Sequence, residues 1–404
     1  MRNLLIMQKS KREIVISNIV LIGMVSLFID MSTEMVYPII PLFLTATLGA
    51  SPAIVGIIEG IAESIASLLK VFSGYIGDKY RNKKVLTFIG YLASVVYKLL
   101  LLLASSWVGV LIARIIDRTG KGVRTAPRDA LVAQSSDKGK LGGSFGLHKM
   151  LDMAGSSIGA FLAFIMVTVG LKYSAAFMWS IIPAVLGIMI IPFIKEDRSK
   201  EQKSEKMTFR GLKLNWKLKL YLAVMFIFNL GNSSNTFLLL KAQNSGFSSS
   251  HVMMLYLIFN VSASLLAIPS GKLSDKFGRS LILVPGYIIY GLVYLGFAFF
   301  NSKILILILF IAYGAYTAFI SGAERAFVAE ISPHGYKGTV LGIYGMIQGI
   351  GLLLASIIAG AMWDHISSEA PFIFGGILGI ASAALISVIL NSGRSLKDIK
   401  RETQ

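Results

Sequence analysis

Residues 74–84 read GYIGDKYRNKK, and residues 271–280 read GKLSDKFGRS. Each stretch follows a long apolar segment and places a glycine and an aspartate before a cluster of basic residues. The aspartates, Asp78 and Asp275, stand 197 positions apart. Glycine at a helix end permits a tight turn and close helix approach, and the acid can accept hydrogen bonds from a neighbouring helix N-terminus. A basic loop alone would not explain the paired Gly and Asp, so the pattern indicates a duplicated chain.

The duplication extends beyond these two stretches. Shifting residues 128–155 by 196 positions gives nine identities in 28 positions, where chance in such a composition gives roughly two or three. Internal repeats are typical of membrane transporters, whose substrate site lies near the midplane between the repeats.

The composition requires a membrane protein. Of the 404 residues, 55% are hydrophobic and only 15% are charged, and the mean hydropathy is +0.71. A soluble domain carries about 25% charged residues, so no water-facing surface of this size could be built. The chain has no cysteine, which excludes disulfides, thiolate metal sites and cysteine nucleophiles. The basic start runs into an apolar segment without a small-residue cleavage site, so we expect no cleaved signal peptide.

Twelve segments are long and apolar enough to cross a bilayer core of about 30 Å as helices. The first and fourth carry polar residues inside. The segments are 14–47, 54–77, 85–104, 107–131, 143–168, 174–194, 218–240, 252–274, 281–300, 304–330, 338–362 and 371–391.

The loops between these segments predict the orientation. Alternate loops, starting with the N-terminus, hold 27 Lys and Arg residues, and the intervening loops hold only Lys172, Lys241 and Lys303. Basic residues stay in the cytoplasm, so both termini are expected there. The short loops and the absence of cysteine fit a prokaryotic cytoplasmic membrane. The net charge of +18 is therefore a topology signal, and no nucleic-acid partner is predicted.

The predicted fold is all-α: twelve transmembrane helices in two six-helix pseudo-repeats. The longest polar stretch, 195–219, holds nine basic and four acidic residues and is expected to be a cytoplasmic linker. The predicted domains are an N-terminal bundle at 1–194, this linker, and a C-terminal bundle with a short tail at 220–404.

Residues 74–84 and 271–280 resemble motif A of the major facilitator superfamily, and the resemblance covers the whole chain. It implies a carrier that moves small solutes by alternating access, commonly coupled to protons. By the same resemblance, Asp78 and Asp275 would help to hold the cytoplasmic helix ends together in the outward-facing state. Arg81 departs from the glycine that the family usually has in the first copy.

The fifth span contains Gly155-Ser-Ser-Ile-Gly159-Ala160, which is similar to a motif found in many of the family's antiporters. Ser156 and Ala160 replace the usual proline and glycine. Small residues at this spacing also pack helices together, and packing is the favoured interpretation.

Apart from Lys219 and Lys272, which are counted with the loops, eighteen charged residues fall within the predicted spans, nine basic and nine acidic. Each costs a few kcal/mol to bury, so a functional role is the default hypothesis, although mutual neutralisation could explain some. We interpret those near the cytoplasmic helix ends as gating or structural pairs. The gating candidates are Arg128, Asp129, Glu324 and Arg325, together with the motif aspartates.

The fourth span carries a basic stripe. Arg114, Arg118, Lys121 and Arg124 follow at offsets of four, three and three, so they share one helical face. Such a face cannot meet lipid. Arg114 is also the best match to the arginine of the family's motif B. The stripe is either an anion-binding site, because guanidinium binds carboxylate or phosphate bidentately, or a ladder neutralised by acids such as Asp117.

Two acidic pairs at i, i+4 lie in the first two spans. Asp30 and Glu34 form the first pair and Glu59 and Glu63 the second. Like charges so close, and burial, favour protonation near neutral pH, which a proton-coupled carrier needs. Asp30 or Glu34 is the expected coupling acid, although pairing with Arg114 or Lys98 is an equally good account.

Two further groups complete the candidate site. His148 and Asp152 share a face of the fifth span and could relay protons, although a lone hydrogen-bonded histidine is common. Asn232 and Asn235 give the seventh span a polar strip suited to substrate hydrogen bonds or to helix contacts.

Taken together, these features predict a secondary active transporter that works as a monomer, with protons, a small-molecule substrate and membrane lipid as its partners. No enzyme motif, cofactor or resident metal is expected. A small organic or chelated anion is the favoured substrate because of the basic stripe. The alternatives are a proton/drug antiporter for lipophilic cations and a divalent metal exporter of the ferroportin type.

Overall fold

The computed structural model describes residues 2–79, 83–136, 141–196, 214–277, 280–333 and 337–391. They divide into two compact units. The first unit comprises residues 1–43 and 68–204, and the second comprises 44–67 and 205–404. The predicted linker stays a prediction, since most of it lies outside the described residues.

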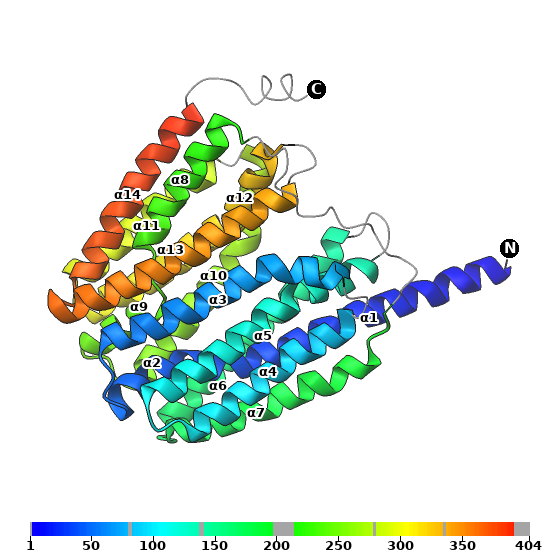
Figure 1. The fold of residues 1–404 in the computed structure, drawn as a ribbon, viewed down its shortest axis with the longest axis horizontal. Coiled ribbons are helices and arrows are strands. Elements are labelled where there is room, and N and C mark those ends of the chain that lie inside the picture. The colour runs from blue at the N-terminus through cyan, green and yellow to red at the C-terminus, as the bar shows by residue number, and fades with distance from the viewer. Residues whose placement is uncertain are drawn as a thin grey trace. The chain divides into compact units, whose positions relative to one another are not determined.

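The described residues are almost entirely helical (Figure 1). The first unit holds α1 (Arg2–Glu34), η1 (Tyr37–Ile39), α2 (Ile40–Leu42), α4 (Lys83–Leu103), α5 (Trp107–Gln134), α6 (Leu141–Thr168), α7 (Tyr173–Ile190) and η3 (Ile191–Phe193). The second unit holds most of η2 (Phe43–Thr47) and the helices α8 (Trp216–Gly231), α9 (Thr236–Asn244), α10 (Ser249–Phe277), α11 (Ser280–Phe299), α12 (Lys303–Ile331), α13 (Lys337–His365) and α14 (Ala370–Asn391). The helix α3 (Pro52–Lys79) contributes residues 52–67 to the second unit and its remainder to the first.

The twelve predicted spans all fall on helices, which confirms the all-α fold. Eleven of them are apolar enough in the described residues to cross a membrane. The fourth, α5, is as long as its neighbours but carries too many charges for that criterion.

Two spans that the sequence suggested as single helices are interrupted. The first continues past α1 as the short turns η1, α2 and η2, because Pro38 and Pro41 cannot donate backbone hydrogen bonds to the preceding turn. The seventh is broken at residues 232–235, between α8 and α9.

Neighbouring hydroxyl groups satisfy the backbone and side chains at the second break. Tyr290 donates a hydrogen bond to the Gly231 carbonyl over 2.7 Å, and the Ser234 N–H donates to the Ser356 hydroxyl over 3.2 Å. Irregular backbone at membrane depth persists only where protein or water satisfies it. The break at 232–235 is therefore stabilised by hydrogen bonds from other helices of the second unit.

In the first unit, α4 and α5 lie side by side, and α1 packs against α6 and α7 (Figure 1). Apolar residues such as Val25, Ile29 and Ala184 form a buried core where α1 meets α7. The α4–α5 pair encloses most of the charged residues described below.

Two glycines of the antiporter-like motif allow α6 to approach α1. A Cβ atom added at Gly155 would lie 2.1 Å from the Leu27 carbonyl oxygen, and one at Gly159 would lie 2.2 Å from that of Met31. Real Cβ atoms do not approach so closely. The motif therefore packs two helices, as the sequence favoured, and the hydroxyl groups of Ser156 and Ser157 bond back to their own helix.

Replacing Gly155 by alanine should loosen the α1–α6 contact. Overpacking of this kind costs about 1–3 kcal/mol, so the purified protein should unfold at a lower temperature. The matched control is Ile158→Val on the exposed face of α6, where an equally small change should stay within about 0.5 kcal/mol. Equal unfolding temperatures for Gly155→Ala and the control would contradict the close approach.

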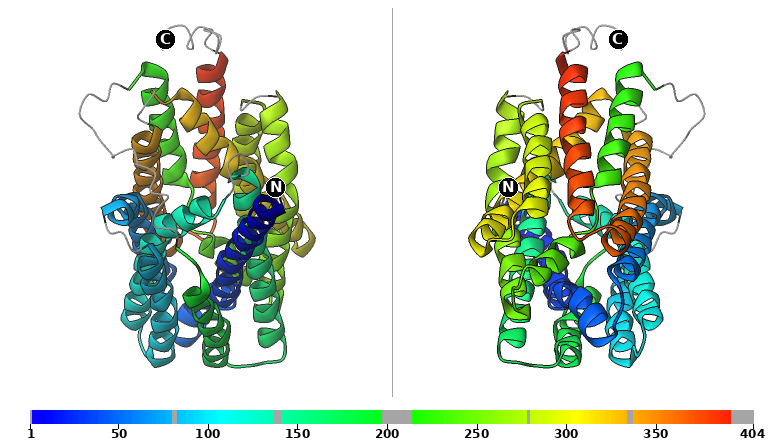
Figure 2. Two further views of the ribbon diagram at one scale, coloured as in Figure 1. Left: turned by 90° about the vertical axis from the view of Figure 1, so that its right-hand side faces the viewer. Right: turned by 90° about the vertical axis from the view of Figure 1, so that its left-hand side faces the viewer.

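In the second unit, α8 packs against α13 and α14, α11 against α12 and α14, and α10 against α12. Figure 2 shows α14, in red, beside α8, in green, in both views.

An ion pair connects α9 to the turn before α14. The Lys241 ammonium, which is 1% exposed, lies 2.8 Å from Oε1 of Glu369, which is 37% exposed. The hydrogen bond from Lys241, with a second from the Ser368 hydroxyl, lowers the pKa of Glu369 from 4.5 to about 2. A carboxyl group whose pKa falls on folding stabilises the fold above its unfolded pKa, and this stabilisation is lost as the pH drops towards the folded value.

The pair should therefore make unfolding sensitive to pH between about 4.5 and about 2. Because Glu369 is partly exposed, a double-mutant cycle of Glu369→Gln with Lys241→Met should give a coupling of at most about 1 kcal/mol. Chemical unfolding in detergent at several pH values would measure it. A coupling that stays constant across this range would refute the assignment.

Candidate functional site

The first unit buries one carboxylate among basic side chains. Asp117 of α5 is 1% exposed and accepts a hydrogen bond of 2.9 Å from the Ser94 hydroxyl on α4. Its Oδ2 lies 3.4 Å from Nη1 of Arg118 and 4.0 Å from Nη1 of Arg114. Lys98 and Arg124 also interact electrostatically with this carboxylate.

All four basic groups around Asp117 are between 0% and 4% exposed. Lys98 donates to the Ser94 carbonyl oxygen over 2.9 Å, and Arg124 donates to the Gly90 carbonyl oxygen over 3.3 Å. Tyrosine rings support the cations as well: Arg114 lies 5.5 Å from the ring centroid of Tyr37, a distance typical of cation–π contact. We call Lys98, Arg114, Asp117, Arg118 and Arg124 the basic cluster.

Lys121 lies on the same side of α5 but is exposed. Ile112 and Lys121 are nine positions apart, which is two and a half turns of an α-helix. The two side chains therefore lie on opposite sides of α5, and Ile112 is 50% exposed on its side. Lys121 is therefore the exposed basic residue on the side of α5 that carries the basic cluster.

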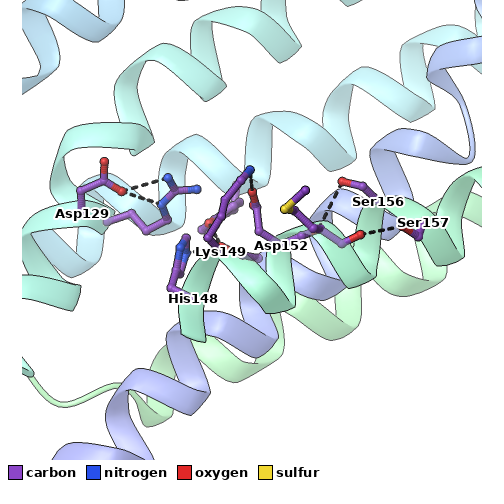
Figure 3. Close-up of polar contacts among 10 residues, drawn as sticks. Asp129, His148, Lys149, Asp152, Ser156 and Ser157 are labelled. Carbon is purple, nitrogen blue, oxygen red and sulfur yellow. Dashed lines mark hydrogen bonds and ion pairs between the residues drawn. The ribbon is translucent and has the colours of Figure 1, made fainter. Parts of the chain in front are cut away.

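The carboxyl groups of Asp30 on α1 and Asp152 on α6 lie within hydrogen-bonding reach of each other. Two carboxyl groups can share a hydrogen bond only when one of them carries a proton. Asp152 also pairs with Lys149 of its own helix (Figure 3). The structure thus brings together two of the predicted proton-coupling residues from different spans.

His148 lies on α6 one helical turn before Asp152 (Figure 3). Its Nε2 is 2.8 Å from the Ser26 hydroxyl, which in turn lies 3.3 Å from the Tyr91 hydroxyl. The histidine is therefore hydrogen-bonded within a polar chain that crosses from α6 through α1 to α4. This contact accounts for a buried histidine whether or not it relays protons.

The gating candidates have different surroundings. Arg128 bonds the adjacent Asp129 over 2.9 Å (Figure 3). Glu324 is 3% exposed and receives hydrogen bonds from Tyr287 and Tyr344. The side chains of Asp78, Asp275 and Arg325 lie outside the described residues.

The remaining predicted residues lie apart from the carboxyl pair or in the other unit. Glu34, at the end of α1, is half-buried next to Gly159. Glu59, buried, and Glu63, half-buried, belong to the second unit. In that unit Asn232 and Asn235 flank the helix break and are half-buried. Asn232 donates to Tyr316 over 3.4 Å, and Asn235 accepts from Tyr313 over 2.7 Å.

Several participants were not predicted from the sequence. Ser26 and Tyr91 form the polar chain with His148, and Ser94 donates to Asp117. In the second unit, Tyr287 and Tyr344 donate to Glu324. One signal could have found two of them, because Tyr91 and Tyr287 stand 196 positions apart, at the offset of the repeat.

The family model of the Major Facilitator Superfamily matches residues 22–241 and 220–403, which cover most of the chain. The chain belongs to the major facilitator superfamily. It is therefore a multi-pass membrane protein of a transporter family.

Known proteins agree with this assignment. An uncharacterised MFS-type transporter of Methanocaldococcus jannaschii is 39% identical over 383 residues, which is 92% of this chain and 94% of the relative. The quinolone resistance protein NorA of Staphylococcus aureus is 28% identical over 145 residues, about a third of each chain (36% and 37%). The solved nucleoside transporter NupG shares the fold with a TM-score of 0.74 at 14% identity, covering 92% of this chain and 99% of that chain.

The basic cluster should depend on Asp117 for stability. Asp117→Asn leaves four buried cations around a neutral amide, and breaking a buried ion pair from one side costs about 3–5 kcal/mol. Lys121→Gln removes an exposed charge from the same helix and should stay within about 0.5 kcal/mol. Thermal unfolding in detergent would compare the two variants. A small loss for Asp117→Asn would mean that the cluster is not held by this carboxylate.

Proposed function

We propose that this protein is a proton-coupled secondary active transporter for a small organic or chelated anion, working by alternating access. It would act as a monomer in the cytoplasmic membrane with both termini in the cytoplasm, as the distribution of Lys and Arg favours.

The observation that carries the substrate class is the charge of the basic cluster. Four buried cations surround the single carboxylate of Asp117. The cluster gathers guanidinium and ammonium groups in one place, and such groups bind carboxylate and phosphate. A bound anion would add negative charge beside these cations, and Lys121 is the exposed basic residue on the same side of α5.

Proton coupling is supported by the Asp30–Asp152 pair. A hydrogen bond between these two carboxyl groups would need one proton, and both residues are on helices that pack together, α1 and α6. Asp30 also interacts electrostatically with Arg124 of the basic cluster. An anion that draws Arg124 away would change the proton affinity of Asp30, which is the link that coupled transport requires.

Thermal stability in the presence of organic anions tests the substrate class. An anion at a hundred times its dissociation constant should stabilise the native state by about 2.7 kcal/mol. Lys121→Gln should weaken the affinity several-fold while it leaves the ligand-free stability unchanged. The matched control is Lys172→Gln, which removes an equally exposed charge at the start of α7. Equal anion responses in both variants would overturn the assignment of the anion site.

Proteoliposomes test the coupling. In Asp30→Asn, the anion accumulation that a pH gradient drives should be lost, whereas exchange of labelled for unlabelled anion should persist. Gradient-driven accumulation in this variant at the wild-type level would exclude Asp30 as the coupling acid.

A second candidate function rests on the relative NorA, whose name describes quinolone resistance. Under this alternative the protein is a proton/drug antiporter for lipophilic cations. The same thermal assay separates the two, because cations would then stabilise the protein, more strongly at alkaline pH, and Asp30→Asn would remove their effect. For the metal-exporter alternative, no group of three or more His, Asp or Glu side chains that could hold a metal ion occurs in the described part of the chain.

A further inference from the structure

Glu324 and Arg128 occupy equivalent positions of the repeat, and equivalent residues surround them. One side chain is acidic and the other is basic. The offset of 196 positions relates Tyr91 to Tyr287, Arg128 to Glu324, His148 to Tyr344, and Asp152 to Gln348. In the first unit, Arg128 interacts with Tyr91 and Asp152. In the second, Glu324 is hydrogen-bonded to all three equivalent side chains.

Neutral side chains donate hydrogen bonds to the Glu324 carboxyl group. Tyr287 of α11 donates to Oε1, and Tyr344 of α13 donates to Oε2 over 2.5 Å. Gln348 donates to the Tyr344 hydroxyl over 2.6 Å, which fixes that phenol as a donor to Glu324. This arrangement suits an ionised carboxylate, which accepts hydrogen bonds only.

Tyr287 has a second acceptor within reach. Its hydroxyl oxygen lies 2.8 Å from Sδ of Met225 on α8. A phenol has one hydrogen, so Tyr287 can donate it either to Glu324 or to the weaker sulfur acceptor. When it turns to Met225, its oxygen is free to accept a hydrogen bond.

From this geometry we propose that Glu324 is a second proton-binding site, in the second unit, and that Tyr287 is its hydroxyl switch. A proton from hydronium forms an O–H bond at Oε1 of Glu324, and the hydronium becomes water. The new O–H donates a hydrogen bond to the Tyr287 oxygen, and the Tyr287 O–H, which stays intact, rotates to donate to Sδ of Met225. Release reverses both steps, and within the protein only the carboxyl O–H bond is made and broken.

The other groups that face Glu324 are compatible with this role. Tyr221 of α8 and Tyr316 of α12 itself interact with it electrostatically, and both are uncharged phenols. The helix α10 meets α12 through Ser270, which donates to the Ala318 carbonyl oxygen over 2.8 Å. The side chain of the adjacent Arg325 lies outside the described residues.

This site goes beyond the proposed function, because it assigns a proton to each unit. The test needs no substrate and no transport, so its failure is distinct from failure of the anion site or of the Asp30–Asp152 coupling.

Infrared difference spectroscopy of the full-length protein in detergent, recorded between acidic and alkaline pH, would detect protonated carboxyl groups by their C=O stretch. Glu324→Gln should remove one titrating band that Asp30→Asn leaves in place. An unchanged set of bands in Glu324→Gln would overturn the proposal.

Two variants test the switch without removing the acid. Met225→Leu removes the sulfur acceptor that the protonated state uses. The Glu324 band should therefore appear at a proton concentration about tenfold higher than in the wild type. Tyr287→Phe removes a hydrogen-bond donor from the carboxylate. The band should therefore appear at a proton concentration about tenfold lower than in the wild type. Met253→Leu, at a buried methionine of α10, is the control and should leave the band in place. Shifts of Met225→Leu and Tyr287→Phe in the same direction would overturn the switch, even if Glu324→Gln does not fold.

Discussion

The attraction between Asp117 and its surrounding cations is the interaction on which the first unit depends. Helices α4 and α5 are the most extensively packed pair in that unit, and the Ser94–Asp117 hydrogen bond lies inside their contact. In a medium of low dielectric constant, each buried cation needs a compensating charge or several hydrogen bonds. Asp117, the carbonyl oxygens of α4 and the tyrosine rings share that compensation, and Asp30 of α1 adds to it through its interactions with Lys98 and Arg124.

Equivalent positions of the repeat carry different side chains in the two units. The offset of 196 relates Ser94, Lys98 and Asp117 of the first unit to Tyr290, Tyr294 and Tyr313 of the second. The first three are joined by hydrogen bonds and charge, and the second three are joined by ring contacts of 4.2 Å and 6.2 Å. Duplication therefore conserved the helix contacts, while one copy became polar and the other aromatic.

The sequence predicts the helices and the basic stripe well because both follow from local periodicity. Arg114 and Arg118 share a face whatever the tertiary structure is. The partner of Asp30 was not predictable in this way, since spacing suggested Glu34 on the same helix and the structure supplies Asp152 from α6. The breaks after α1 and α8 were missed for a related reason: hydropathy averages over a window, whereas a break depends on one proline or on hydroxyl groups from distant helices.

The charge of α5 also bears on how the protein is made. An insertion cost of about 2.5–3.5 kcal/mol for each central Arg, Lys or Asp would keep a lone helix with this composition out of the bilayer. Only residues 104–106 separate α4 from α5. The partners of Asp117 and Arg124, which are the Ser94 hydroxyl and the Gly90 carbonyl oxygen, are on α4 and so precede α5 in the chain. The two helices would therefore leave the translocation machinery together, as a hairpin whose polar contacts form before either segment meets lipid.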